Sequence, residues 1–175
     1  MKNDLPRINT NQHEYKKEVI IIAAMSENRV IGKNNVMPWS IKEEMAHFTK
    51  LTKGWPCIMG RKTWESLKKK PLPGRLNIVV SGKIGETLQS FPDVKIFPSL
   101  PAAIEYCLDY EKIFICGGES IYRQALEFAN KIELSVIHAQ YEGDTFFPEI
   151  DESCWTVTGK EDFDEFSFIT YTRKE

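Results

Sequence analysis

The run Val19-Ile-Ile-Ile-Ala-Ala-Met25 decides the type of fold that we expect for this chain. It is apolar throughout, and its β-branched residues suit a fully buried strand better than a secretion signal. Strand-like and helix-like segments then alternate through the first half of the chain, which predicts right-handed crossovers and a mostly parallel sheet. The last three strand-like segments lack helices between them, so the C-terminal edge of the sheet should be antiparallel.

Turn signals and apolar runs set the expected bounds of these elements. Strands are expected at 19–25, 56–59, 76–80, 94–97, 112–116, 132–138, 154–160 and 165–172. Helices are expected at 41–53, 63–69, 100–110 and 120–129. The sequence therefore predicts a single α/β domain over 19–175, with a mostly parallel central sheet of about eight strands, an antiparallel C-terminal edge and about four flanking helices. Residues 1–18 are expected to form a flexible N-terminal extension.

The composition excludes several classes of protein. The 175 residues are 42% hydrophobic and 27% charged, which is ordinary for one soluble domain. A net charge of -2 without a basic block argues against nucleic acid as the main partner. The four cysteines and three histidines lack metal-ligand spacing, so we expect no metal site. No stretch approaches the length of a membrane span, and we expect a cytoplasmic protein.

The segment Ile31-Gly-Lys-Asn-Asn-Val-Met-Pro-Trp39 precedes a helix that carries a carboxylate on its apolar side. At 3.6 residues per turn, one stripe of that helix contains Ile41, Glu44, Met45 and Phe48. An ionised carboxylate on a buried stripe costs several kcal/mol and normally has a polar partner. No Lys or Arg has the spacing to pair with Glu44, so a cationic or hydrogen-bond-donating ligand is the candidate. Alternatively, Glu44 only favours the positive N-terminus of the helix.

The start of the same helix contains a second acidic residue with a structural interpretation. Ser40-x-x-Glu43 has the pattern of a capping box, in which Ser40 accepts from the backbone and Glu43 reaches back. The pattern predicts that Glu43 stabilises the helix terminus.

Three strand ends carry residues suited to anions. Met59-Gly-Arg-Lys-Thr63 and Cys116-Gly-Gly-Glu-Ser120 each place glycine before a helix N-terminus, and Ser81-Gly-Lys83 follows a third strand. Each segment alone could be a plain turn, but together they suggest a multiply phosphorylated ligand such as a dinucleotide. Arg75 follows the rigid turn Pro71-Leu-Pro-Gly74 and could clamp a carboxylate or simply be solvated.

These segments, in this order, resemble the dihydrofolate reductase family. The resemblance covers almost everything beyond residue 18, and its motifs are Val19-Ile-Ile-Ile-Ala-Ala-Met25, Asn28-Arg-Val-Ile-Gly32, Met37-Pro-Trp39, Ile58-Met-Gly-Arg-Lys-Thr-Trp-Glu-Ser66, Pro71-Leu-Pro-Gly-Arg75, Ile115-Cys-Gly-Gly118, Ile121-Tyr122 and Tyr141-Glu-Gly-Asp-Thr-Phe-Phe-Pro148.

The resemblance implies NADPH-dependent reduction of 7,8-dihydrofolate to tetrahydrofolate, with hydride transfer to C6 of the pterin and protonation at N5. It implies that Glu44 binds the pterin 2-amino group and adjacent ring nitrogen, and that Ser135 hydrogen-bonds both the acid and the pterin. Trp39 would order a water near the acid, and Gly32 through Met37 would form a mobile loop that closes over the nicotinamide. Because Glu44 lies far from N5, it would orient and polarise the ring, and water would deliver the proton.

The resemblance also implies the residues that bind substrate and cofactor. Arg75 would hold the α-carboxylate of the glutamate tail, while the walls around the pterin and benzoyl rings would comprise Ile22, Ala23, Ala24, Phe48 and Leu67. The cofactor would contact Ala24, Ile31, Gly32, Gly60, Arg61, Lys62, Thr63, Ser81, Gly82, Lys83, Cys116, Gly117, Gly118, Glu119, Ser120 and Tyr122. We also expect a cis peptide between Gly117 and Gly118, antifolate inhibitors as ligands, and a monomer.

Three departures from the family pattern stand out. The run Lys68-Lys-Lys70 is one residue longer than in compact bacterial members, His47 replaces a frequent aromatic, and Gly82 lacks a hydroxyl that some members use on the 2′-phosphate. Two other functions are compatible with the same fold. The riboflavin-pathway reductase should lack the acid at Glu44, the loop and the Arg75 clamp. A catalytically silent ligand-binding protein would differ from a dihydrofolate reductase only in an activity assay.

Overall fold

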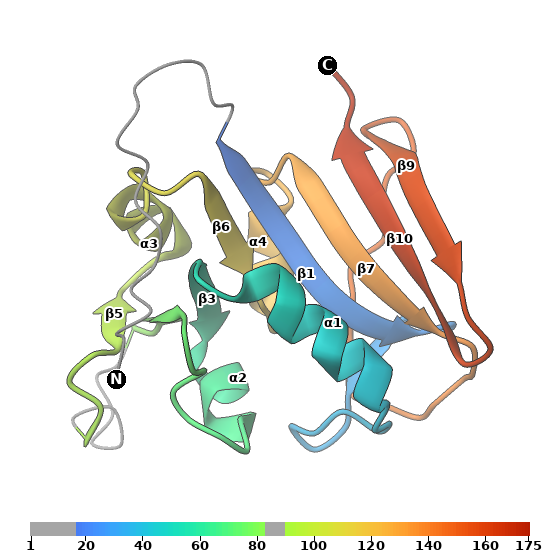
Figure 1. Cartoon of the computed structure of the whole chain (residues 1–175), viewed down its shortest axis with the longest axis horizontal. Helices are drawn as coiled ribbons and strands as arrows, with labels where there is room; N and C mark the ends of the chain where they lie inside the picture. Colours follow the sequence, from blue (N-terminus) through green and yellow to red (C-terminus); the bar gives the residue numbers. More distant parts are fainter. Residues whose placement is uncertain (1–16, 83–89) are drawn as a thin grey trace.

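The computed structural model describes residues 17–82 and 90–175, and within them eight strands form one sheet in the order β5-β4-β3-β6-β1-β7-β10-β9 (Figure 1). The strands are β1 (Glu18–Ser26), β3 (Pro56–Gly60), β4 (Leu76–Val80), β5 (Lys95–Phe97), β6 (Lys112–Ile115), β7 (Lys131–Ile137), β9 (Trp155–Asp162) and β10 (Phe166–Arg173). All pairs from β5 through β7 are parallel, and β10 is antiparallel to both β7 and β9. The predicted mixed α/β sheet is confirmed.

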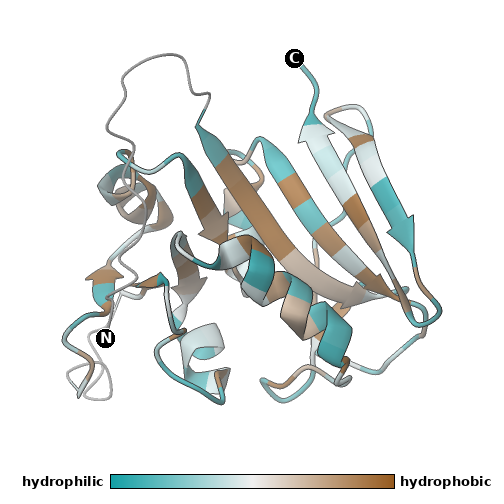
Figure 2. Cartoon of the chain, viewed as in Figure 1, coloured by the Kyte–Doolittle hydropathy of each residue, from teal (hydrophilic) through white to brown (hydrophobic). Residues whose placement is uncertain are grey.

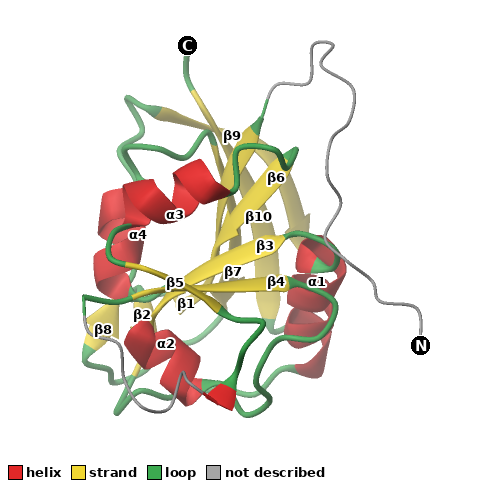
Figure 3. Cartoon of the chain, turned by 90° about the vertical axis from the view of Figure 1, so that its left-hand side faces the viewer, coloured by secondary structure: helices red, strands yellow, loops and turns green. Residues whose placement is uncertain are grey.

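Helices cover both faces of this sheet, as expected for parallel strands joined by crossovers. They are α1 (Lys42–Thr52), α2 (Arg61–Ser66), α3 (Leu100–Tyr106) and α4 (Glu119–Ala125). Figure 3 shows α1 on one side of the sheet and both α3 and α4 on the other. Within the described ranges, no helix is long and apolar enough to cross a membrane.

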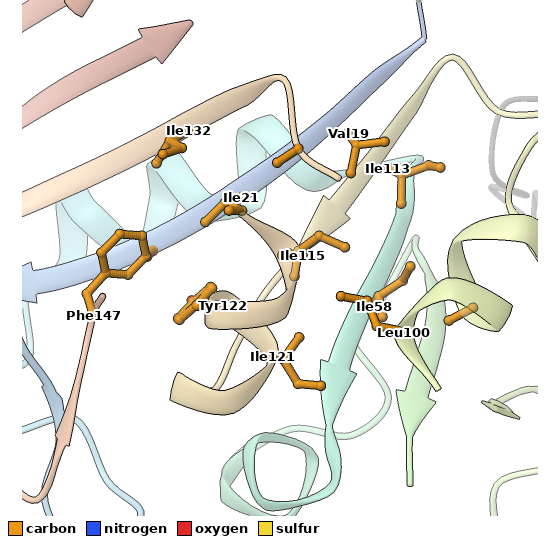
Figure 4. Close-up of a cluster of buried hydrophobic side chains, with 14 of the residues drawn as sticks. Val19, Ile21, Ile58, Leu100, Ile113, Ile115, Ile121, Tyr122, Ile132 and Phe147 are labelled. Carbon is orange, nitrogen blue, oxygen red and sulfur yellow. The ribbon is translucent and has the colours of Figure 1, made fainter. Parts of the chain in front are cut away.

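The core consists of two layers separated by the sheet, and apolar residues are concentrated along β1 and its neighbours (Figure 2). On the side of α3 and α4, Ile21 and Ile115 from the central strands pack with Leu100 and Ile121 from the helices (Figure 4). On the side of α1 and α2, Trp64 is 1% exposed and packs with residues of β1 and β3. Burial on both faces explains why the central strands are uninterrupted apolar runs.

A second sheet that the sequence analysis missed lies beside the first. It pairs β2 (Val30–Gly32) with β8 (Thr145–Phe146) in antiparallel orientation. Strands of two or three residues are too short to produce a recognisable alternation of apolar and polar residues. This pairing brings the chain after β1 against the 141–148 region, far away in sequence.

Several predicted helix ends were wrong, for a shared reason. The helix expected at 63–69 is α2, and it stops at Ser66 because Leu67 leaves the helical conformation and its N–H bonds to Trp64 three residues back. The segments after Tyr106 and Ala125 also continue as turns with three-residue hydrogen bonds rather than as α-helix.

The predicted capping box at Ser40 was also wrong. Helix α1 begins at Lys42 with Ile41 as its N-cap, and no side chain caps it. Ser40 therefore lies one position outside the cap, from which its hydroxyl does not serve the first-turn N–H groups. Helix α3, in contrast, has a capping side chain, because Ser99 is its N-cap and accepts from the Ala102 N–H.

Candidate functional site

A cavity of about 940 Å³ opens at the carboxyl ends of the parallel strands, where ligands bind in such sheets. The predicted site residues that line it are Ile22, Ala23, Ala24, Ile31, Gly32, Met37, Glu44, Phe48, Gly60, Arg61, Lys62, Thr63, Leu67, Cys116, Gly117, Gly118, Glu119, Ser120 and Tyr122. The structure thus brings together residues from β1, α1 and two strand–helix junctions. Asn34, Asn35 and Val36 of the loop predicted at 32–37 also line the cavity. Lining residues that the sequence analysis did not propose are Met45, Met59, Glu65, Ser66, Leu72, Asp144 and Thr145.

The remaining predicted site residues lie outside this lining. They are Trp39, Arg75, Ser81, Gly82 and Ser135, while Lys83 falls outside the described residues. Met45 shares the stripe of Glu44 but is 46% exposed, because that part of α1 faces the cavity rather than the core.

Glu44 is the buried acid of the cavity. Its side chain belongs to α1, the residue is 6% exposed, and the Ser135 side chain of β7 lies near its carboxylate. Burial raises the pKa of Glu44, and hydrogen bonding by Ser135 opposes that shift to a smaller extent. Within the described residues no Lys or Arg forms an ion pair with it, so the acid retains acceptor capacity toward the cavity.

A second buried polar group lies close by in sequence. Trp39 is 8% exposed and packs with its ring centroid 5.4 Å from that of Tyr141. Its indole N–H is a buried donor without an acceptor in the described part of the chain. A buried donor of this kind is uncommon and usually has a functional explanation.

His47, one turn after Glu44 on α1, is stacked against Phe168 of β10 with ring centroids 3.7 Å apart. Burial lowers the pKa of His47, with a raising contribution from Glu161 and a lowering one from Lys50. The histidine thus fills an aromatic position by stacking, and within the described residues it does not line the cavity.

The two glycine motifs lie side by side. Gly60 at the end of β3 donates its N–H to the carbonyl of Gly117 after β6, at 2.8 Å. The Gly117–Gly118 peptide is cis, as predicted, and Gly117 has φ +113°. A Cβ on Gly117 would come within 3.2 Å of the Tyr122 ring, and one on Gly118 within 3.3 Å of Thr63 Oγ1. The junction therefore forms a close backbone cradle that larger residues would fill.

Cationic side chains stand at the edge of this cradle. Arg61 is paired with Glu65 at 3.5 Å across one turn of α2, and both side chains are nearly half exposed. Lys62 is exposed and has no carboxylate partner within the described residues. Ser81 follows β4 and donates its N–H to the Phe97 carbonyl, so the 81–82 segment continues the same sheet edge.

Residues 33–36 form a tight hairpin at the cavity. The N–H and C=O groups of Lys33 and Val36 bond reciprocally at 2.8 and 3.0 Å, and Asn34 and Asn35 between them have φ of 50° and 64°. Two central residues with positive φ define a type I′ turn, and asparagine tolerates it well. The dipeptide Asn34–Asn35 was the signal that the sequence analysis missed.

Three contacts hold this hairpin against the rest of the site, and one of them is an ion pair between Lys33 and Glu142 at 3.0 Å. The Asn34 N–H donates to the Asp144 carboxylate at 2.9 Å, and the Asn35 amide donates to the Lys62 carbonyl at 3.0 Å. The hairpin therefore bridges the 141–148 region and the start of α2 across the cavity.

Arg75 lies outside the cavity lining, beside the lining residue Phe48. Its Nε donates to the Pro73 carbonyl at 2.9 Å and its Nη1 to Thr52 Oγ1 at 3.0 Å. The Thr52 hydroxyl donates in turn to the Phe48 carbonyl, and the guanidinium lies 5.8 Å from the Phe48 ring. A guanidinium has five N–H groups, so these bonds leave three, including the terminal Nη1–Nη2 edge that suits a carboxylate.

Comparison with known proteins identifies this arrangement. A sequence profile of dihydrofolate reductase matches residues 18–173. The chain is 46% identical over 138 residues to a dihydrofolate reductase of Neisseria gonorrhoeae, covering 79% of this chain and 83% of that one. The chain belongs to the dihydrofolate reductase family.

Other relatives agree over a larger part of the chain. A dihydrofolate reductase of Bacillus subtilis is 36% identical over 163 residues, which cover 89% of this chain and 95% of the relative. A solved structure of the Enterococcus faecalis dihydrofolate reductase, complexed with NADP(H) and RAB-propyl, superposes with a TM-score of 0.80 at 28% identity and covers 90% of this chain and 97% of that one.

The chain therefore catalyses the reduction of 7,8-dihydrofolate to 5,6,7,8-tetrahydrofolate, with NADPH as its cofactor. The cavity fits such a cofactor in three respects. The Gly117–Gly118 cradle admits close approach, the first turns of α2 and α4 present backbone N–H groups, and Lys62 offers a cation. The predicted fold, activity and cofactor are confirmed, while the role of each site residue remains a prediction.

Proposed function

We propose that Glu44 and Ser135 form the pterin-recognition pair of this dihydrofolate reductase. The observation that carries this proposal is a carboxylate that is 6% exposed, lines the cavity and has no cationic partner within the described residues. The 2-amino group and the adjacent ring nitrogen of a pterin present two donors side by side, which match the two carboxylate oxygens. We assign to Ser135, whose hydroxyl lowers the pKa of Glu44, the role of holding the acid in orientation.

NADPH supplies a hydride when bound, and the residues of the chain align the two rings and exclude water. Ile22, Ala23, Ala24, Phe48 and Leu67 form the apolar walls around the pterin and benzoyl rings. Glu44 polarises the pterin from its amino edge, and a water ordered near Trp39 delivers the proton to N5. Met37 and the hairpin at 33–36 close the cavity over the nicotinamide.

Arg61, Lys62 and Thr63 would bind the cofactor phosphates, and Ser81 and Gly82, with Lys83 outside the described residues, would bind the adenosine end. The second glycine motif would hold the pyrophosphate and nicotinamide ribose, and Ala24, Ile31 and Gly32 would hold the nicotinamide. The backbone cradle and the exposed Lys62 support this placement.

Arg75 binds the α-carboxylate of the glutamate tail through its terminal Nη1–Nη2 edge. The bonds to Pro73 and Thr52 support this role, because they fix the plane of the guanidinium and leave that edge available.

We also propose the finer assignments of state and location. Residues 19–175 form the catalytic domain and 1–18 an extension, and the enzyme is a cytoplasmic monomer that does not bind nucleic acid. The net charge of -2 supports the last point. Light scattering after size exclusion would reveal the mass of 20.2 kDa for a monomer, and a doubled mass would contradict it.

A crystal structure with bound folate and NADP⁺ tests the residue roles directly. We expect both Glu44 oxygens within hydrogen-bond distance of the pterin amino edge and the glutamate α-carboxylate on Arg75. A pterin whose amino edge faces away from Glu44 would refute the central assignment.

A further inference from the structure

Asn77 is a buried amide whose hydrogen bonds all serve the turn that carries Arg75. It belongs to β4 and is 3% exposed. Its Oδ1 accepts from the Leu72 N–H at 2.8 Å, and its Nδ2 donates to the Leu72 and Arg75 carbonyls at 3.0 Å each. Both amide protons are therefore engaged, which is the full donor capacity of the side chain.

Of the two residues that Asn77 holds, one lines the cavity and the other lies beside a lining residue. Leu72 lines the cavity and packs in the core layer of α1 and α2, and Arg75 lies 5.8 Å from the ring of Phe48, which also lines the cavity. Asn77 itself is anchored in the sheet, because β4 pairs with both β3 and β5. The amide thus fixes the backbone of Leu72 and Arg75, which has little regular structure of its own, relative to a strand of the sheet.

We propose that Asn77 is a positioning residue that sets recognition of the substrate tail through Leu72 and Arg75. This inference rests on the proposed role of Arg75. The geometry gives Asn77 a functional role beyond fold stability, because a carboxylate clamp depends on angle and distance to within about 1 Å. Loss of the amide bonds frees the backbone of both residues while the pterin end, held by α1 and β7, is unaffected.

The test uses Asn77→Asp, which keeps the shape of the side chain but has no N–H to donate to the two carbonyls. Steady-state kinetics would compare dihydrofolate with 6-methyl-7,8-dihydropterin, a substrate that ends at the pterin ring. We expect the KM for dihydrofolate to rise at least about tenfold with little change in kcat, the scale of a displaced charge-assisted bond. The constants for the short substrate should stay within about twofold of the parent.

Asn130 provides a matched control. Its amide also bridges backbone groups, accepting from the Val19 N–H at 3.0 Å and donating to the Lys17 carbonyl at 2.8 Å, but it lies outside the cavity lining. Asn130→Asp should lower the melting temperature and leave both KM values at the parental level. If Asn77→Asp fails to fold, the same two substrates would be compared in Asn77→Ser, which introduces no charge.

The outcomes separate this inference from the function on which it rests. A parental KM for dihydrofolate in a destabilised Asn77→Asp protein would show a purely structural role and overturn the inference. Equal losses with both substrates would overturn it as well. Arg75→Lys should be measured in the same series. A raised KM for dihydrofolate in Arg75→Lys, with a parental KM in Asn77→Asp, refutes only the inference about Asn77. A parental KM in Arg75→Lys refutes both the role of Arg75 and the inference about Asn77.

Discussion

Replacing Glu44 with Gln tests the central assignment most directly. The amide keeps the size of the carboxyl group, but it carries no charge and presents one acceptor where the carboxylate presents two. In the proposed complex the second position of the amide is a donor that faces a donor of the pterin. The substitution therefore removes ring polarisation toward N5 protonation without altering the apolar walls.

The size of the effect follows from the bonds that are lost. Two hydrogen bonds to a charged group are worth about 1.5–3 kcal/mol each, and one neutral bond that replaces them about 1 kcal/mol. The central loss is about 3.5 kcal/mol, which corresponds to about two and a half orders of magnitude in rate. That value lies within the range for a positioned acid–base group. The burial of Glu44, at 6% exposure, argues against the screening that weakens exposed charges.

The same variant has a defined effect on stability. Burial raises the pKa of Glu44, so the ionised form disfavours folding, and stability is greatest below the unfolded pKa and falls as pH rises through the folded pKa. Gln resembles the protonated acid at every pH. Glu44→Gln should therefore raise the melting temperature of the ligand-free protein at neutral pH, and this gain should vanish as the pH falls toward the ordinary carboxyl value of 4.5.

Turnover would be followed through NADPH absorbance, with Glu43→Gln as the matched control because Glu43 is the neighbouring exposed carboxylate on α1. The Glu44→Gln variant should regain activity steadily toward acid pH, where more dihydrofolate is already protonated at N5. Near-parental turnover of this variant at neutral pH would remove Glu44 from the mechanism. Equal losses in the Glu43→Gln control would instead indicate a general effect of helix charge.

Four further outcomes are expected. Arg75→Lys should weaken dihydrofolate binding by about 1.5–3 kcal/mol in fluorescence titrations and spare substrates without the glutamate tail; equal losses would make Arg75 a structural residue. Thr52→Val should raise the KM for dihydrofolate severalfold, while Thr52→Ser, which keeps the hydroxyl, should have the KM of the parent enzyme. Equal KM values for the two variants would contradict a role for the bond to Arg75. Lys62→Ala should raise the KM for NADPH but hardly that for NADH, unlike the exposed control Lys69→Ala; equal effects on both cofactors would exclude a 2′-phosphate contact. Asp144→Ala should lower kcat/KM for NADPH about threefold to tenfold by releasing the hairpin, and an unchanged value would make that contact dispensable.

The sheet was predictable because its central strands are buried on both faces. Such strands are largely apolar runs, as in 19–25 and 112–116, and their parallel orientation follows from the alternation of strands and helices. Strand β4 was predicted at its observed bounds, 76–80, because a turn and a glycine segment delimit it. Helix ends were harder to predict, since the segments 107–110 and 127–128 keep helical composition while their hydrogen bonds tighten to three-residue turns.

Site residues could likewise be predicted only where the local sequence pattern reveals them. A buried charge such as Glu44 can be recognised from sequence because it violates the apolar pattern of its helix. Leu72 and Asp144 violate no local pattern, and their roles depend on contacts made across the fold. Asn77 does interrupt the apolar run of β4, but that run does not indicate which turn the amide holds. The hairpin at Asn34–Asn35 is an intermediate case, with a local turn signal that acquires meaning only through its long-range partners.

The polar groups of the site differ in how firmly the fold holds them, and this difference suggests that one part aligns the substrate and another part opens to admit it. Glu44 and Ser135 lie on α1 and the central sheet, so the pterin end of the site is as rigid as the core. The hairpin at 33–36 is held by three described bonds, all on exposed groups, from Lys33, Asn34 and Asn35, and is the part of the cavity wall that opens most easily. Because substrate and cofactor must enter and leave while the two rings stay aligned during the reaction, a fixed pterin pocket beneath a lightly held cover satisfies both requirements.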